Sequence, residues 1–157
     1  MSCSLAIAVS LLLSDPAVAV AAAQPASATV PASVASEPLF ADIVARSGGL
    51  KAIVDGWMAS GAADAAGFTA SPIFTGFKSQ IVELAARDMQ GHLVLQERGT
   101  DGDLKCILRG ISEDMPLKLA AVESAATKAE RDVALSELSY LLNDNVEVIT
   151  APPQPAV

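Results

Sequence analysis

The sequence predicts a mainly α-helical protein, a compact bundle of about five helices, and three observations support this fold class. Phe77, Ile81 and Leu84 recur at the spacing of one helical face. A second apolar stripe of the same period runs from Ala134 to Leu142, with polar residues on the opposite side. The Thr-x-x-Glu pattern at 127–130 is typical of a helix start, and it directly precedes that stripe.

The first helices are expected on either side of a glycine pair. Phe40 to Arg46 has the pattern of a short helix, which Gly48 and Gly49 would end. A second helix is predicted from Leu50 to about Ala59. Glycines and a proline between positions 61 and 72 then indicate a loop.

The central part holds one clear helix and one ambiguous stretch. The periodic stripe predicts a helix from about Thr75 to Gln90. Residues 92–109 fit two structures: a short β-hairpin turning at the Asp-Gly pair 101–102, or a continued helix followed by a new one ending at Gly110. Leu, Gln, Glu and Arg dominate these segments and favour the helical alternative.

Two further helices are predicted towards the C-terminus. Ser112 or Asp114 is placed to cap a helix with Pro116 in its first turn, where the missing N–H costs nothing. The last helix is expected to start at Thr127 and to end at Asn143-Asp144-Asn145. Residues 146–149 are then expected to be extended.

The first 23 residues are predicted to be a cleavable signal peptide. Leu5 to Leu13 is an apolar run, followed by Asp15-Pro16 and by small residues with A-x-A spacing up to Ala23. The run is too short to be a stable membrane anchor. A Pro/Ala/Ser linker at 24–38, a single helical domain at 39–150 and a flexible tail at 151–157 are expected to follow. The chain is therefore predicted to be extracytoplasmic, periplasmic rather than fully secreted.

The net charge and the absence of known motifs argue against several classes of function. The formal net charge is −8, and the acidic residues are spread along the chain, which disfavours nucleic acid and anionic membranes as partners. No phosphate loop, C-x-x-C, H-E-x-x-H or G-x-S-x-G motif occurs. We therefore predict no cofactor and no metal site.

Asp88 and His92 form the most distinctive polar pair. At positions i and i+4 they continue the apolar stripe of the 75–90 helix. A carboxylate one turn from an imidazole is the arrangement of a general base or an oriented ligand. The simpler interpretation is a histidine that satisfies carbonyls at a helix end, and we prefer it.

Cys106 remains alone once the predicted leader, with Cys3, is removed. It is a weak candidate nucleophile, with His92 as its base. On a helix it would point away from the neighbouring apolar residues, and a homodimer linked through Cys106 is one alternative.

By elimination, we expect a protein that acts through protein contacts, as an accessory, adaptor or inhibitor-type module without catalytic activity. Trp57, Met58, Phe68 and Phe74 surround the predicted loop and are candidate contact residues, although they equally fit a core. The alternative is an extracytoplasmic enzyme or ligand- or metal-binding protein that uses Asp88 and His92, with Cys106 as a further candidate.

Overall fold

The computed structural model describes residues 33–100 and 102–151, and these form four long helices. They are α2 (Pro38–Ser60), α3 (Pro72–Arg98), α4 (Gly102–Ser124) and α5 (Lys128–Thr150). Two single-turn 3-10 helices, η1 (Ala62–Asp64) and η2 (Phe68–Ala70), connect α2 to α3. The described ranges contain no strand, so the mainly α-helical prediction is confirmed.

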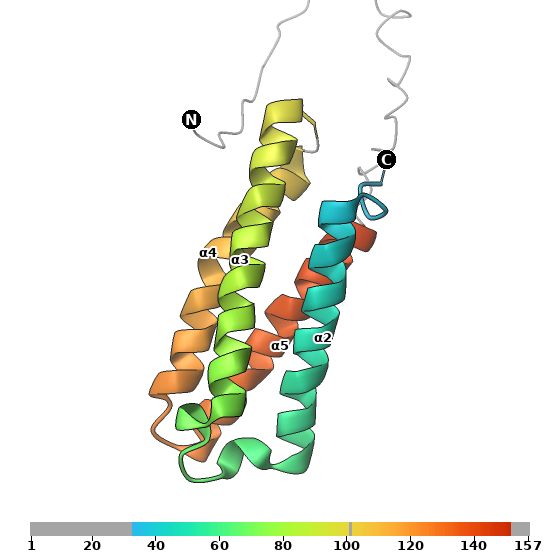
Figure 1. Ribbon diagram of the computed structural model, residues 1–157. Helices are drawn as coiled ribbons and strands as arrows, with labels where there is room; N and C mark the ends of the chain where they lie inside the picture. The colour runs from blue at the N-terminus through green and yellow to red at the C-terminus, as the bar shows by residue number, and fades with distance from the viewer. Residues whose placement is uncertain (1–32, 101, 152–157) are drawn as a thin grey trace, which may run out of the picture. The chain divides into compact units, whose positions relative to one another are not determined.

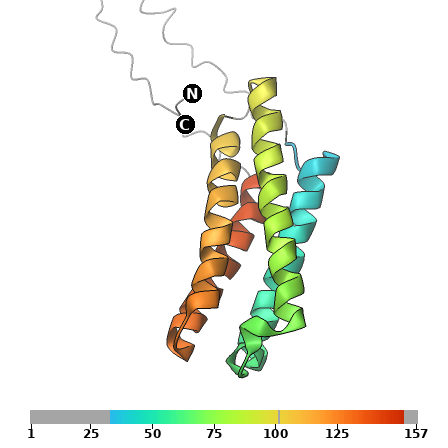
Figure 2. The ribbon, with the colours of Figure 1, turned by 60° about the vertical axis from the view of Figure 1, so that its left-hand side comes forward.

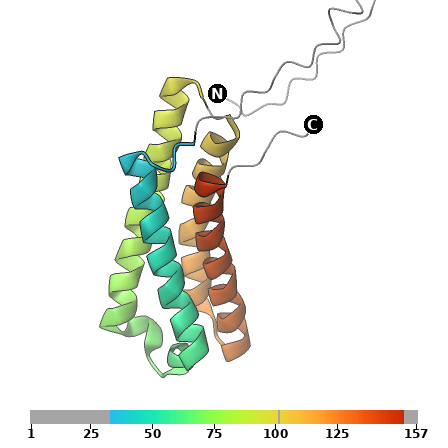
Figure 3. The same ribbon diagram turned by 90° about the vertical axis from the view of Figure 1, so that its right-hand side faces the viewer.

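The four helices run alternately up and down as an antiparallel bundle (Figures 1, 2 and 3). Each helix packs against the next one in the chain, and α5 closes the ring against α2. The start of α2 and the end of α5 therefore lie at the same end of the bundle (Figure 1). Large apolar side chains from all four helices form a single core.

Helix α2 continues through Gly48 and Gly49, so the prediction of two short helices was wrong. Both glycines lie on the solvent side with open space around them. Leu50, Val54 and Trp57 continue the buried stripe that begins before the pair. Two glycines cost about 1 kcal/mol each relative to alanine, whereas each buried large side chain contributes about 1.5–3 kcal/mol. Packing therefore outweighs the local helix-breaking tendency.

The segment 92–109 is helical in its described residues, and the hairpin alternative is wrong. Residues up to Arg98 belong to α3, and α4 begins at Gly102. Gly99 ends α3 in the left-handed conformation, with φ 66°, and its N–H donates to the Gln96 carbonyl. The buried residues Leu95 and Leu104 lie on either side of this turn and belong to the core.

Helices α4 and α5 are longer than the sequence predicts. Helix α4 passes through Gly110 and Pro116, because Leu108, Met115 and Leu119 keep one of its faces buried. Pro116 costs about 3 kcal/mol in a helix interior, which this burial offsets. Helix α5 does not end at 143–145, and residues 146–149 are helical rather than extended.

Two helices begin at the lower end of the bundle in Figure 1, α3 and α5, and each has a side-chain cap. The Thr127 hydroxyl accepts from the Glu130 N–H, and the Glu130 carboxylate accepts from the Thr127 N–H. This reciprocal pair is the predicted capping box, and it is confirmed. At the start of α3, the Ser71 hydroxyl accepts from the Phe74 N–H.

Residues 1–32 and 152–157 are outside the described part of the chain, and they include the predicted signal peptide, residues 24–32 of the predicted linker and all of the predicted tail except Ala151. Among the described helices, none combines the length and the apolar character needed to cross a membrane.

Candidate functional site

Three polar side chains from three helices meet inside the bundle. Ser47 of α2, Asp88 of α3 and Asn145 of α5 have no exposed surface. The Asn145 side-chain nitrogen lies 3.0 Å from both carboxylate oxygens of Asp88 and 3.0 Å from the Ser47 hydroxyl oxygen. We refer to these three residues as the polar cluster.

Burial controls the chemistry of the polar cluster. Desolvation raises the pKa of Asp88 from its usual 3.8 to about 7, and the hydrogen bond from Asn145 opposes this shift only in part. The side-chain oxygen of Asn145 is buried and has no hydrogen-bond partner in the described part of the chain. Burial therefore favours the protonated, neutral form of Asp88 in a site that is closed to solvent.

His92 lies one turn beyond Asp88 but contacts a different helix. Its Nδ1 is 2.8 Å from the Lys105 carbonyl on α4, and because a carbonyl only accepts, Nδ1 carries the proton. Within the described residues, no hydrogen bond or ion pair joins Asp88 to His92. The two side chains therefore take part in two separate inter-helix contacts. His92 contacts a carbonyl, but this carbonyl lies on α4, and His92 lies inside α3 rather than at a helix end.

Gly91 explains why α3 and α4 approach closely beside His92. A Cβ atom at this position would lie 3.1 Å from a Leu108 methyl carbon and 3.3 Å from the Phe40 ring. Only a residue without a side chain fits here without displacing fully buried neighbours. This close approach brings the Lys105 carbonyl within reach of His92.

Cys106 and the four candidate contact residues differ in how deeply they are buried. Cys106 is half-buried on α4. Trp57, Phe68 and Phe74 are buried and, with Phe77, form a cluster of edge-on and tilted ring contacts with centroids 4.7–6.2 Å apart, so they contribute to the core. Met58 is 37% exposed. No group of three or more His, Cys, Asp or Glu side chains in the described ranges is arranged to hold a metal ion.

An open groove runs between α4 and α5 on the outside of the bundle, and the sequence interpretation missed it. Its first part, of about 650 Å³, lies where α4 ends and α5 begins, and its second part, of about 480 Å³, follows towards the middle of both helices. Glu137 lines both parts. We call the whole the α4–α5 groove, and its lining residues are Asp114, Lys118, Ala121, Ser124, Ala125, Ala126, Ala129, Glu130, Val133, Ala134, Ser136, Glu137, Tyr140, Leu141 and Asp144.

The α4–α5 groove is lined by apolar side chains together with several carboxylates. Val133 and Tyr140 are 59% and 68% exposed, and Leu117, at 65%, lies one turn from Ala121 on the same side of α4. Among its described lining residues are four carboxylates, from Asp114, Glu130, Glu137 and Asp144, and a single ammonium, from Lys118. Lys118 pairs with Glu137 over 2.9 Å, and the Glu130 carboxylate belongs to the capping box. Burial and the neighbouring Glu147 raise the pKa of Asp144. This surface is suited to an apolar partner with positive charge.

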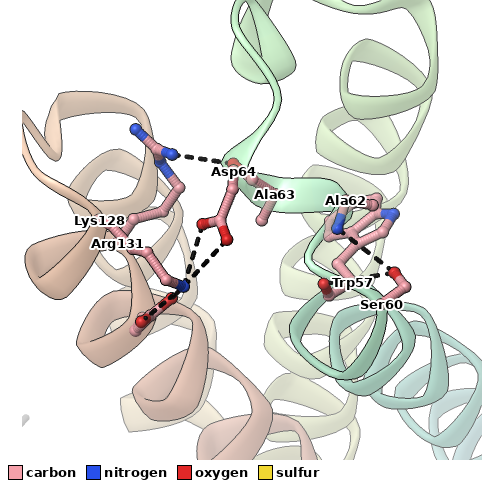
Figure 4. Close-up of polar contacts among 8 residues, drawn as sticks. Trp57, Ser60, Ala62, Ala63, Asp64, Lys128 and Arg131 are labelled. Atoms are coloured by element: carbon pink, nitrogen blue, oxygen red, sulfur yellow. Dashed lines mark hydrogen bonds and ion pairs between the residues drawn. The ribbon is translucent and has the colours of Figure 1, made fainter.

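One end of the α4–α5 groove is held in place by contacts with the α2–α3 connection (Figure 4). Lys128, in the first turn of α5, forms ion pairs with Asp64 of η1 and with Asp132. These two carboxylates raise the pKa of Lys128. Arg131 donates to the Ala63 carbonyl over 2.8 Å. Together these contacts position the first turns of α5, which carry Ala129 and Val133.

Comparison of the chain with protein-family models, curated proteins and solved structures found no match in any of the three.

Proposed function

We propose that the chain is an exported helical module that acts through protein contacts, and that the α4–α5 groove is its docking surface. The observation that carries the proposal is the grouping of exposed apolar side chains, Val133 and Tyr140, with several alanines. Apolar patches rimmed by polar residues are typical of interaction sites. Alanines at Ala121, Ala125 and Ala129 leave room for another backbone to approach closely.

The partner that fits is an amphipathic helix with an apolar face and basic flanks. An open groove between two antiparallel helices accepts a third helix, whose side chains at i, i+3 and i+4 contact it. Asp114 and Asp144, which form no ion pair within the described residues, favour Lys or Arg on that helix. A second copy of this chain would bring the same acids face to face, which disfavours self-association through the groove.

The second candidate function is an enzyme or ligand-binding protein centred on Asp88 and His92, with Cys106 as a further candidate. The raised pKa of Asp88 favours it, since strongly shifted carboxyls cluster at functional sites. However, Asp88 has no exposed surface and its oxygens face Asn145, so a ligand has no direct access to it. The contact function therefore agrees better with the geometry.

A matched pair of valine variants tests the proposal. Val133 lies in the α4–α5 groove, whereas Val82 lies on α3 with similar exposure, 55% against 59%. The chain is recovered from the extracytoplasmic fraction of expressing cells, and its complexes are measured by non-reducing native mass spectrometry. We expect a protein complex with the wild-type chain and with Val82→Glu, and its loss with Val133→Glu.

Three results would contradict the proposal. The first is a wild-type chain that carries no protein partner. The second is a partner that is lost equally with both variants. The third is a bound small molecule or metal that is lost with His92→Ala, which would support the second candidate function. A dimer that dissociates on reduction would instead place Cys106 at an interface between copies.

A further inference from the structure

The polar cluster contains a buried carboxyl without a cationic partner. Within the described residues, the one hydrogen-bond donor to Asp88 is the neutral amide of Asn145. Removing an ionised carboxylate from water costs far more free energy than one neutral hydrogen bond supplies. Buried carboxylates therefore either pair with a cation or take up a proton.

The charged side chains on the helical turns near Asp88 form no ion pair with it in the described chain. Arg46 of α2 pairs with Asp42 and Glu83, and Arg87 of α3 also pairs with Asp42. Other titratable or charged groups at the same level are His92 on α3, Lys105 and Arg109 on α4, and Asp144 and Glu147 on α5. His92 is bound to the Lys105 carbonyl, Arg109 pairs with Glu113, and Asp144 lines the α4–α5 groove. No ion pair in the described chain reaches Asp88.

We infer that Asp88 is held as a neutral carboxylic acid in the folded bundle, and that its protonation stabilises the packing of α2, α3 and α5 in a pH-dependent way. The Asn145 amide can form a hydrogen bond with either protonation state of Asp88. Its nitrogen donates to the carboxylate, and when the amide group is rotated by 180° its oxygen accepts from the carboxylic acid. In the turned orientation the Ser47 hydroxyl can also donate to that oxygen. Loss of the proton leaves a buried charge that the neutral Asn145 amide stabilises only in part.

The direction of the pH effect follows from the linkage between protonation and folding. Burial raises the pKa of Asp88 in the folded chain to about 7, whereas its usual value is 3.8. Since the folded state binds the proton more tightly, the stabilisation is complete below pH 3.8 and decreases as the pH rises. Above about pH 7 it is lost. The free energy of unfolding should therefore decrease as the pH rises from about 4 to about 7 and should change little with Asp88 above that range.

Chemical unfolding of the full chain from pH 4 to pH 8 tests this inference, with Asp88→Asn as the variant. Asparagine keeps the shape of the side chain and its contact with Asn145, but it has no proton to lose. We expect the urea midpoint of the wild type to decrease across this range more steeply than that of Asp88→Asn, which should be the more stable protein at pH 8. Glu97→Gln, which changes an exposed carboxyl of α3 outside the α4–α5 groove, should keep the wild-type slope.

Infrared spectroscopy gives a second readout that does not depend on unfolding. At pH 6 the difference between the infrared spectra of the folded wild type and Asp88→Asn should contain a carboxylic-acid carbonyl band of the wild type, and this band should disappear as the pH approaches 8. Parallel stability profiles for wild type and Asp88→Asn, or the absence of this difference band at pH 6, would overturn the inference.

Discussion

The amide nitrogen of Asn145 lies 3.0 Å from both carboxylate oxygens of Asp88, although 57 positions separate the two residues in the sequence. The contact joins α5 to α3 across the interior of the bundle, and Ser47 of α2 completes it. A polar contact that is shared by three helices fixes their relative register, because one wrong helical turn would leave every partner unsatisfied.

Replacing Asn145 by alanine should destabilise the protein by about 2–4 kcal/mol, since it leaves Asp88 and Ser47 buried without their partner. The matched control is Asn143→Ala, whose amide bonds only the exposed Glu147 one turn away. The control should change stability by less than about 0.5 kcal/mol. Urea unfolding at pH 6 measures both, and equal losses would show that the polar cluster does not stabilise the bundle.

Gly91→Ala and Gly48→Ala should have opposite effects. Alanine at 48 meets open space on a helix surface and should stabilise the protein by about 0.5–1 kcal/mol. Alanine at 91 would press on the buried Leu108 and Phe40 side chains, and overpacking of this kind costs about 1–3 kcal/mol. Thermal unfolding of the two variants checks the contrast. Two variants of equal stability would mean that α3 and α4 can separate slightly without cost.

His92→Ala should lower the free energy of unfolding by about 1–2 kcal/mol, because the Lys105 carbonyl loses its side-chain donor. Gln96→Ala, at an exposed position one turn further along α3, serves as the control and should be neutral. Partner binding should be the same for both variants. If His92→Ala kept its stability but lost binding of a ligand or metal, His92 would be a binding residue and not a structural one.

The export prediction is tested by the mass of the protein recovered from an expressing cell. Cleavage after Ala23 predicts a chain of residues 24–157 in the extracytoplasmic fraction. A chain that keeps residues 1–23 and stays in the cytoplasm would contradict the signal-peptide prediction. The same preparation, measured without reductant, reports whether Cys106 links two copies.

The sequence predicted the parts of the fold that depend on neighbouring residues. The stripe of Phe77, Ile81 and Leu84 is the buried face of α3, and the pattern at 127–130 is the capping box of α5. Helix ends set by distant partners were missed. Asn145 belongs to an Asn-Asp-Asn segment of the kind that often ends a helix, but its contact with Asp88 and Ser47 keeps it inside α5. A contact between residues so far apart in the sequence cannot be predicted from a local pattern.

The α4–α5 groove was missed for a related reason. The sequence places Val133 and Tyr140 on the polar side of the last helix, where single apolar residues are common. Only the packing of α4 beside α5 brings them into one surface with Ala121 and the surrounding acids. By contrast, Asp88 and His92 stood out in the sequence as polar residues on an apolar stripe, and both are buried.

Site-specific photo-crosslinking tests the docking surface most directly. A photoreactive amino acid replaces Tyr140 in the α4–α5 groove or, as the control, Gln80 on the exposed face of α3, and each chain is irradiated in expressing cells. The proposed function predicts a protein adduct from position 140 alone, with the crosslinked peptide mapping to a basic amphipathic helix of the partner. Adducts of equal yield from both positions, or no adduct from position 140, would contradict it.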